Sequence, residues 1–165
     1  MKVVLALGSN LGDRFDTLQG ALDALFDAPG FGFVAVSPVY ETDPVGGPEQ
    51  GHYLNAVVIA ESSLDPRAIL ERAQSVENAF GRIRMERWGA RTLDVDLIMV
   101  GDVVSGDPEL TLPHPRAHER AFVLVPWSRV DPEATLAGRR VTDLLAGLDQ
   151  KGVRLRADLT LQRPE

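Results

Sequence analysis

The sequence has no cysteine and no long apolar run. Without cysteine there is no disulfide framework, no thiolate nucleophile and no thiolate-ligated metal, and the composition fits a reducing compartment. No stretch reaches the roughly 18 apolar residues of a membrane span. The start of the chain has too little charge and too few apolar residues before Gly8 for a signal peptide. We therefore expect a soluble, cytoplasmic protein that does not enter a membrane.

Positive charge is also scarce. The net charge is −7 and the pI is about 5.0, which argues against a general binder of nucleic acid or of anionic membranes. Arg82, Arg84, Arg87 and Arg91 nevertheless lie close together in the sequence, and in an acidic protein such a cluster indicates a small anionic ligand. No internal repeat, low-complexity segment or linker divides the chain, so we expect a single domain over 1–165.

A strand-like stretch at 91–100 carries two carboxylates, Asp94 and Asp96, among branched apolar residues. Side chains alternate along a strand with a rise of roughly 3.3 Å per residue, so both carboxylates point the same way, with Cα atoms ~6.6 Å apart. The residues expected on the opposite face are Leu93, Val95, Leu97 and Met99. At ~4 Å and an effective dielectric of ~20, two carboxylates repel by about 4 kcal/mol. Mg²⁺ shared with phosphates would remove this cost; the alternative is two aspartates on a solvated edge strand, each paired with an arginine.

The apolar patterns predict a βαββαβ order. Strands are expected at 2–7, 33–42, 52–60 and 91–100, and helices at 15–26 and 65–80. A helical turn at 115–120, a small helix at 142–148 and a last strand at 153–161 follow. This order is typical of a ferredoxin-like α+β sandwich, with helices on one face of an antiparallel sheet, to which a C-terminal extension is added.

Three connecting segments could bind a ligand. The loop 8–13 could hold phosphate at a helix N-terminus, but it lacks the lysine of a P-loop, and a capping turn is the alternative. The Gly- and Pro-rich loop 43–51 is long enough for a lid, although a plain hairpin connection would also explain it. The arginine-rich segment 81–90 runs into the carboxylate strand, as expected where Mg²⁺ and guanidinium groups share a polyphosphate; Arg–Asp surface pairs are the alternative.

Two further groups of side chains could recognise a ligand. Tyr53 and Asn55 share one face of a strand, where they could stack on a flat heterocycle and read its edge, or serve as ordinary sheet residues. His114, Arg120 and Phe122 lie close together in the sequence, which makes a ligand contact more plausible for the histidine than it would be for an isolated one.

Four fragments together resemble the 6-hydroxymethyl-7,8-dihydropterin pyrophosphokinase (HPPK) family. They are RWGARTLDVD at 87–96, LGSNLG at 7–12, YLNA at 53–56 and LPH at 112–114. Each fragment is weak alone, but they occur in order and at matching spacing over nearly the whole chain. The resemblance fades after about Pro132.

The resemblance implies an enzyme of folate biosynthesis that transfers the terminal pyrophosphoryl unit of ATP to the pterin hydroxymethyl group and releases AMP, with two Mg²⁺ ions. Asp94 and Asp96 would bind the metal, and Arg82 and Arg91 would clamp the phosphates; these four would be the catalytic residues, with no committed general base. The ATP side would consist of Leu70, Gln74, Glu77, Arg82, Arg84, Trp88, Arg91, Leu97, Thr111, His114 and Arg120. The residues around the pterin would be Thr42, Val45, Tyr53, Asn55 and Phe122, with the ring between the two aromatic side chains.

The loops 43–51 and 81–90 are expected to close over the site. We further expect a monomer that acts on small molecules, and the acidic net charge argues against a nucleic-acid or membrane partner. Two positions differ from some relatives, which have an aromatic residue in place of Pro115 and a basic residue in place of Glu109. A ferredoxin-like module that senses a nucleotide or RNA without turnover, and a catalytically dead relative, are the alternative hypotheses.

Overall fold

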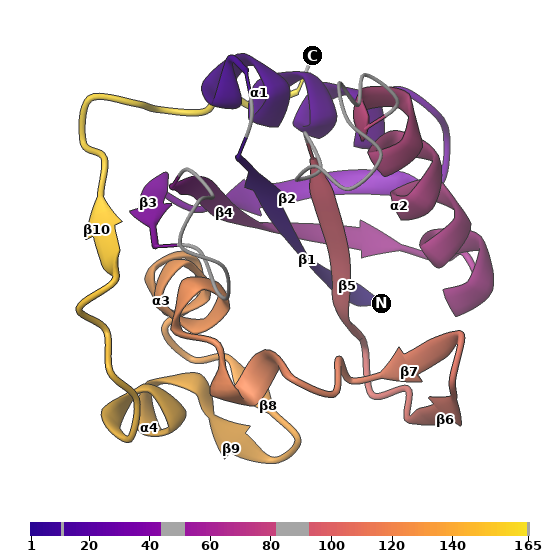
Figure 1. The fold of residues 1–165 in the computed structure, drawn as a ribbon. Coiled ribbons are helices and arrows are strands. Elements are labelled where there is room, and N and C mark those ends of the chain that lie inside the picture. Colours follow the sequence, from indigo (N-terminus) through magenta and orange to yellow (C-terminus); the bar gives the residue numbers. More distant parts are fainter. Residues whose placement is uncertain (11, 44–51, 82–92, 165) are drawn as a thin grey trace.

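Strand β1 (Lys2–Ser9) lies in the middle of the sheet and pairs antiparallel with β4 (Tyr53–Ser62) on one side and β5 (Asp94–Val100) on the other (Figure 1). The computed structural model describes residues 1–10, 12–43, 52–81 and 93–164. Every residue of β1 after Lys2 is buried. A strand that is covered on both faces has a near-continuous apolar run, as β1 has, instead of an alternating one.

Beyond β4 the sheet continues through β3 (Tyr40–Thr42) to β10 (Val153–Leu155), in the order β10-β3-β4-β1-β5. Strand β2 (Phe31–Val36) pairs with the opposite end of β4. All pairings described in this sheet are antiparallel. Because β4 inserts between β1 and β3, the two halves of the βαββαβ order interleave as in a split βαβ unit. The predicted antiparallel sheet with packed helices is confirmed.

The predicted continuous strand 33–42 is wrong, because the chain breaks into β2 and β3 at Ser37–Val39. Ser37 donates its N–H to the carbonyl of Val57, but its hydroxyl, and not its carbonyl, accepts the N–H of Val57, both at 2.9 Å. Pro38 follows and has no N–H to donate to a ladder. The Ser37 hydroxyl therefore provides an acceptor for the Val57 N–H of β4 at the point where regular strand pairing stops.

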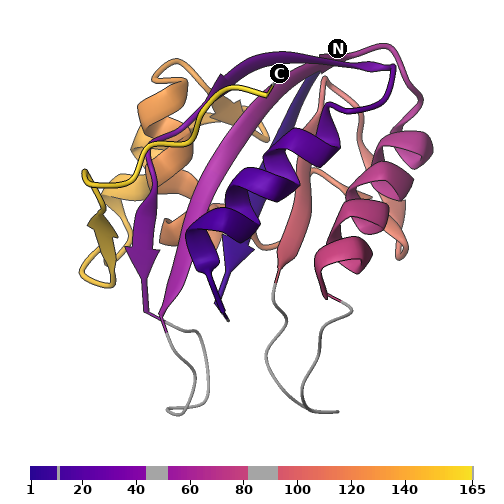
Figure 2. The same cartoon turned by 90° about the horizontal axis from the view of Figure 1, so that it is seen from above.

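One face of the sheet is covered by α1 (Arg14–Leu25) and α2 (Pro66–Gly81), which lie side by side in Figure 2. Asp13 caps α1 by accepting the N–H of Asp16, so the capping-turn interpretation of this loop is confirmed. The apolar side chains that recur at helical spacing in the two predicted helices are buried or partly buried in this core: Phe15, Leu18, Leu22, Leu25, Phe26, Ile69, Ala73, Val76 and Phe80. Its fully buried helical side chains include Leu18, Leu22, Leu25 and Ile69.

The opposite face is also covered, by elements that follow the βαββαβ core, whose own two helices share one face as expected. A 3₁₀ turn η1 (Ala117–Glu119), α3 (Ala121–Val130) and α4 (Val141–Ala146) pack there around the buried Trp127. Side chains along β1 and β4 point alternately to the two faces of the sheet. Those of Val4, Val57 and Ile59 pack in the second core, and their neighbours along each strand pack in the first. Apolar side chains on both sides of a sheet require two covering layers, and part of the C-terminal extension supplies the second.

A β-bulge in β5 corrects one predicted orientation. Val4 pairs with Met99 and Leu5 with Leu97, which leaves Ile98 as an extra residue. Ile98 and Met99 both pack in the second core, so Met99 does not share the face of Leu97. The bulge follows the carboxylates along the strand and leaves their alternation intact.

Two small hairpins flank the sheet: β6 (Ser105–Asp107) with β7 (Leu110–Leu112), and β8 (Thr135–Leu136) with β9 (Arg139–Arg140). The last strand is shorter than the predicted 153–161. The N–H of Arg156 still donates to Val39, but the next position along β3 is Pro38, which cannot donate, and pairing ends. None of the described helices is long and apolar enough to cross a membrane.

The difference in burial between Val58 and Val104 predicts that truncating these two valines will change the stability of the protein by different amounts. Val58 in β4 is fully buried, whereas Val104 is 83% exposed. We expect Val58→Ala to lower the free energy of unfolding by about 2 kcal/mol, from ~0.8 kcal/mol for each lost carbon plus a cavity contribution. Val104→Ala should change it by less than about 0.5 kcal/mol. Urea unfolding followed by circular dichroism measures both, and equal effects would contradict the packing described.

Candidate active site

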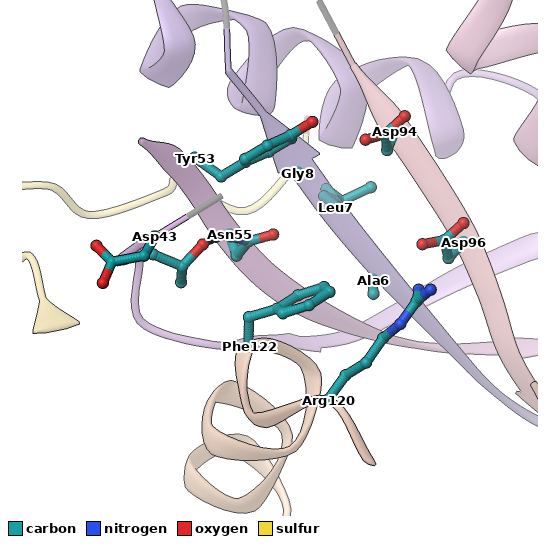
Figure 3. Close-up of a pocket in the computed structure, with 11 residues that line it drawn as sticks. Ala6, Leu7, Gly8, Asp43, Tyr53, Asn55, Asp94, Asp96, Arg120 and Phe122 are labelled. Atoms are coloured by element: carbon teal, nitrogen blue, oxygen red, sulfur yellow. Dashed lines mark hydrogen bonds between the residues drawn. The ribbon is translucent and has the colours of Figure 1, made fainter. Parts of the chain in front are cut away.

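The carboxylates of Asp94 and Asp96 point from β5 into one cavity, and Figure 3 shows them on the same side of the strand. Both residues are partly buried, whereas Val95 between them is buried in the first core. Their partners on β1 are Gly8 and Ala6. Because these two residues are small, the space beside the carboxylates stays open. The predicted shared face of the aspartates is confirmed.

This first cavity has a volume of about 220 Å³. Strands β1, β3, β4 and β5 form its floor and sides, and the start of α3 faces the sheet across it (Figure 3). Its lining consists of Ala6, Leu7, Gly8, Thr42, Asp43, Tyr53, Asn55, Asp94, Asp96, Arg120 and Phe122. Tyr53 comes from β4 and Phe122 from α3, so two aromatic rings lie on different walls. Such a space suits a flat ring.

Several of the polar groups that line this cavity contact a neighbouring side chain. The side-chain N–H of Asn55 donates to the Thr42 hydroxyl at 2.5 Å, and both residues are buried. The guanidinium of Arg120 lies 5.6 Å from the centre of the Phe122 ring, within cation–π range. Burial, and then the charge of Asp94, raise the pKa of Tyr53, so its phenol stays protonated and can donate a hydrogen bond.

Gly8 occupies a position where a side chain would collide with the site. A Cβ at residue 8 would lie 2.8 Å from the Asn55 carboxamide oxygen and 3.5 Å from the Tyr53 ring. Glycine is used here for close approach of the backbone. Ala6 is not among the predicted site residues, and Gly8 is predicted only as part of a possible phosphate loop. The signal for them is the alternation of small residues with Leu5 and Leu7 along an apolar strand.

A second cavity, of about 330 Å³, lies between α2, β5, the β6–β7 hairpin and His114. Asp94 and Asp96 line this cavity as well as the first, so the carboxylate pair stands where the two meet. Glu77 on α2 accepts the N–H of Val95 at 2.9 Å and ties the helix to β5 beside the pair. The lining comprises Leu70, Gln74, Glu77, Asp94, Val95, Asp96, Leu97, Pro108, Glu109, Leu110, Thr111, Leu112, His114 and Pro115.

Comparison with known proteins identifies the family. A model of the family described as 7,8-dihydro-6-hydroxymethylpterin-pyrophosphokinase (HPPK) matches residues 4–132. The chain belongs to the HPPK family.

Curated proteins called 2-amino-4-hydroxy-6-hydroxymethyldihydropteridine pyrophosphokinase are similar over most of their length. That of Mycobacterium leprae is 53% identical, over 98% of this chain and 91% of its own. That of Mycobacterium tuberculosis is 52% identical, over 93% and 89%, and that of Bacillus subtilis 41%, over 88% and 93%. The crystal structure of Plasmodium falciparum HPPK-DHPS A437G with SDX-DHP has a TM-score of 0.68 at 15% identity. That match covers 88% of this chain but only 45% of the other, and it shows the fold alone.

The geometry brings together most of the residues that the HPPK resemblance singled out. The first cavity gathers Thr42, Tyr53, Asn55, Phe122 and Arg120, and the last of these was expected on the ATP side. The second cavity gathers Leu70, Gln74, Glu77, Leu97, Thr111 and His114. The two positions that differ from some relatives, Glu109 and Pro115, also line it. Val45, Arg82, Arg84, Trp88, Arg91 and both proposed lids except Asp43 and Gly81 lie outside the described residues.

His114 is held in one tautomer at the edge of the second cavity. Its backbone N–H donates to the carbonyl of Ile98 at 2.8 Å, and its Nδ1 accepts the N–H of Arg116 at 3.1 Å. The proton of the neutral ring therefore resides on Nε2. Burial lowers the pKa of His114; Asp96 raises it, and Arg120 and Arg116 lower it further.

We therefore expect His114 to titrate below its usual 6.5 and to be neutral at pH 7. The pH dependence of the imidazole Cε1–H resonance in NMR spectra measures this, with His114→Gln to assign the signal. Arg120→Gln should raise the pKa, because it removes a nearby positive charge. Arg139→Gln, on the β8–β9 hairpin, is the matched control. A pKa at or above 6.5, or the same change in both variants, would contradict this environment.

Proposed function

We propose that the chain transfers the pyrophosphoryl unit of ATP to 6-hydroxymethyl-7,8-dihydropterin, giving the pterin diphosphate and AMP, in folate biosynthesis. The observation that carries the proposal is the carboxylate pair at the junction of two cavities. Among the described residues, Tyr53 and Phe122 line the first cavity and no Phe, Tyr or Trp lines the second, which fits an enzyme that joins a flat ring to a polyphosphate. Membership of the HPPK family and the names of the relatives support the same reaction.

The pterin belongs in the first cavity. Its ring would lie between Tyr53 and Phe122, which face the cavity from opposite walls (Figure 3). Asn55 and Thr42 would read its edge, because their side chains already bond to each other and are fixed. The backbone near Val45 remains a proposed contact from the resemblance. Aromatic walls with a few oriented polar groups are typical of small-molecule sites.

ATP belongs in the second cavity, with its phosphates directed to the carboxylate pair. Leu70 and Leu97 offer apolar contact there, whereas Thr111 and the Nε2–H of His114 offer hydrogen bonds. Arg120 lies on the first-cavity side of the pair, where it would meet the transferred phosphates. Arg82, Arg84, Trp88 and Arg91 are proposed as further ATP contacts on the resemblance alone.

The donor atoms at the junction fit Mg²⁺. Asp94 and Asp96 offer hard carboxylate oxygens that face the same space, and an octahedral cation held by two carboxylates keeps positions for water and phosphate oxygens. In the part of the chain that the structure describes, no group of three or more His, Asp or Glu side chains that could hold a metal is found, so the pair would need water or phosphate oxygens to complete the coordination. Two bound Mg²⁺ ions would neutralise charge on the phosphates. The number of ions is part of the proposal.

The chain's own contribution is placement. Phosphoryl transfer needs little covalent chemistry from the protein, so an in-line arrangement of the pterin hydroxyl and ATP supplies most of the rate. The side chains of Tyr53 and Phe122 orient the acceptor, and the neutral His114 donates a hydrogen bond without adding charge. No committed general base is proposed. We further propose a monomer, and a cytoplasmic location where ATP is available.

The decisive experiment supplies the purified chain with ATP, Mg²⁺ and 6-hydroxymethyl-7,8-dihydropterin and identifies both products by mass spectrometry. We expect AMP and the pterin diphosphate. ADP as the released nucleotide would move the chain to an ordinary kinase class. Binding of both ligands without any product would support the alternatives of a sensor or an inactive relative.

The carboxylate pair predicts a loss of turnover with retained folding. We expect Asp94→Asn and Asp96→Asn each to lower kcat at least about 10²-fold, the scale for removing one oriented stabilising group. Asp102→Asn, at an exposed position outside both cavities, should retain activity. Initial AMP formation measures the rates, and circular dichroism checks the fold. If either site variant kept activity within about threefold of the unchanged chain, the proposed role of Asp94 and Asp96 in catalysis would be contradicted.

A further inference from the structure

We propose that the C-terminal segment positions the pterin-reading residues, through a carboxylate at Glu41 that Arg14 and Arg156 hold from two sides. The inference rests on the proposed function and adds a part of the chain beyond the family match, which ends at residue 132. Glu41 and Arg156 are positioning residues that lie outside both cavities.

Glu41 joins three separate parts of the fold. Its Oε2 accepts from Nη1 of Arg14 on α1 at 3.0 Å and from Nη1 of Arg156 at 3.2 Å. Arg14 also donates to the carbonyl of His52, just before β4, at 2.8 Å. The Glu41 side chain is only 21% exposed, so solvent screens these contacts less than those of an open surface pair.

The pKa of Glu41 agrees with this arrangement. Burial alone would raise it, but the hydrogen bond and charge of Arg14, together with the charges of Arg156 and His52, lower it below its ordinary value. The carboxylate is therefore ionised at neutral pH, as two guanidinium partners require.

Strand β10 secures the same region through its backbone. It pairs with β3 in the register Val153 to Thr42 and Leu155 to Tyr40, and lies beside it in Figure 1. The N–H of Asp43 donates to Gly152 at 2.9 Å, just beyond this register. Without β10, β3 would be a three-residue edge strand with one row of unpaired backbone groups, and such short strands are weakly held.

The connection to the site runs through Thr42. This buried residue lies next to Glu41 on β3, and its hydroxyl accepts the amide N–H of Asn55. A looser β3 would release that bond and let the Asn55 side chain turn. The second cavity is lined by α2, β5 and the β6–β7 region and by none of these residues. The effect should therefore fall on the pterin and spare ATP.

The experiment measures pterin and ATP separately in Arg156→Leu and Glu41→Gln. We expect the KM for the pterin to rise about 3- to 10-fold, the scale of a partly buried ion pair, with the KM for ATP and kcat nearly unchanged. Arg156→Lys should recover part of the loss, because it restores the charge. The double variant should raise the KM for the pterin by less than the product of the single effects, because the Glu41–Arg156 contact is common to both. Each single variant also removes a contact of its own, with Arg14 for Glu41→Gln and with Asp158 for Arg156→Leu.

Arg163→Leu is the matched control, because Arg163 lies in the same C-terminal segment but stacks on Phe33 of β2. It should leave the KM for the pterin unchanged. Circular dichroism establishes that each variant is folded. Unchanged pterin KM in folded Arg156→Leu, or equal rises for pterin and ATP, would overturn the proposal.

Direct binding separates this inference from the proposed function. Calorimetric titration of hydroxymethylpterin, with Mg²⁺ and a nonhydrolysable ATP analogue present, does not require turnover. If the unchanged chain binds the pterin but forms no AMP, the proposed function fails, and the weaker binding expected of Arg156→Leu still tests the positioning role. If the unchanged chain is active and both chains bind the pterin equally, only the positioning role fails.

Discussion

The structure depends on two negative charges held on one face of a partly buried strand. The backbone cannot carry Asp94 and Asp96 apart, because Leu93, Val95 and Leu97 are packed in the first core. Two carboxylates ~4 Å apart at an effective dielectric of ~20 repel by about 4 kcal/mol unless a positive charge lies near them. Small residues on β1 leave open space beside the pair, Arg120 at the N-terminus of α3 lines the same cavity, and the two cavities meet at this point. The proposed binding of a cation and of phosphate rests on this arrangement.

Local patterns predicted what depends on neighbouring residues. The alternation along β5 placed both aspartates on one face, and the apolar spacing of α1 and α2 gave two helices. Other features depend on distant contacts and escaped prediction. At the break, the N–H of Val57 on the partner strand donates to the Ser37 hydroxyl in place of a backbone carbonyl. The bulge at Ile98 becomes visible only from the register with β1. The second covering layer reflects apolar residues on both faces of β4, which a short sequence window cannot distinguish from one buried face.

The residues of the site also divide into those that a local pattern places and those that only distant contacts bring in. Tyr53 and Asn55 are two residues apart on one strand, so the period of a strand suffices to place them together. Phe122 reaches the same cavity from another element, and only the family resemblance linked it to them. Gly8 carries no chemistry of its own, and its importance appears only when Asn55 and Tyr53 are seen against its backbone. Sequence patterns thus reveal groups that act on a ligand more readily than positions that make space for one.

The central place of β1 affects how the chain reaches its native state. Both of its edges must be paired and both of its faces covered, yet its neighbours are Tyr53–Ser62 and Asp94–Val100, far along the chain. Such non-local closure slows folding relative to a helical bundle of similar size. Until β4 and β5 are in place, the almost wholly apolar β1 presents open hydrogen-bonding groups along both edges, where other strands could pair wrongly.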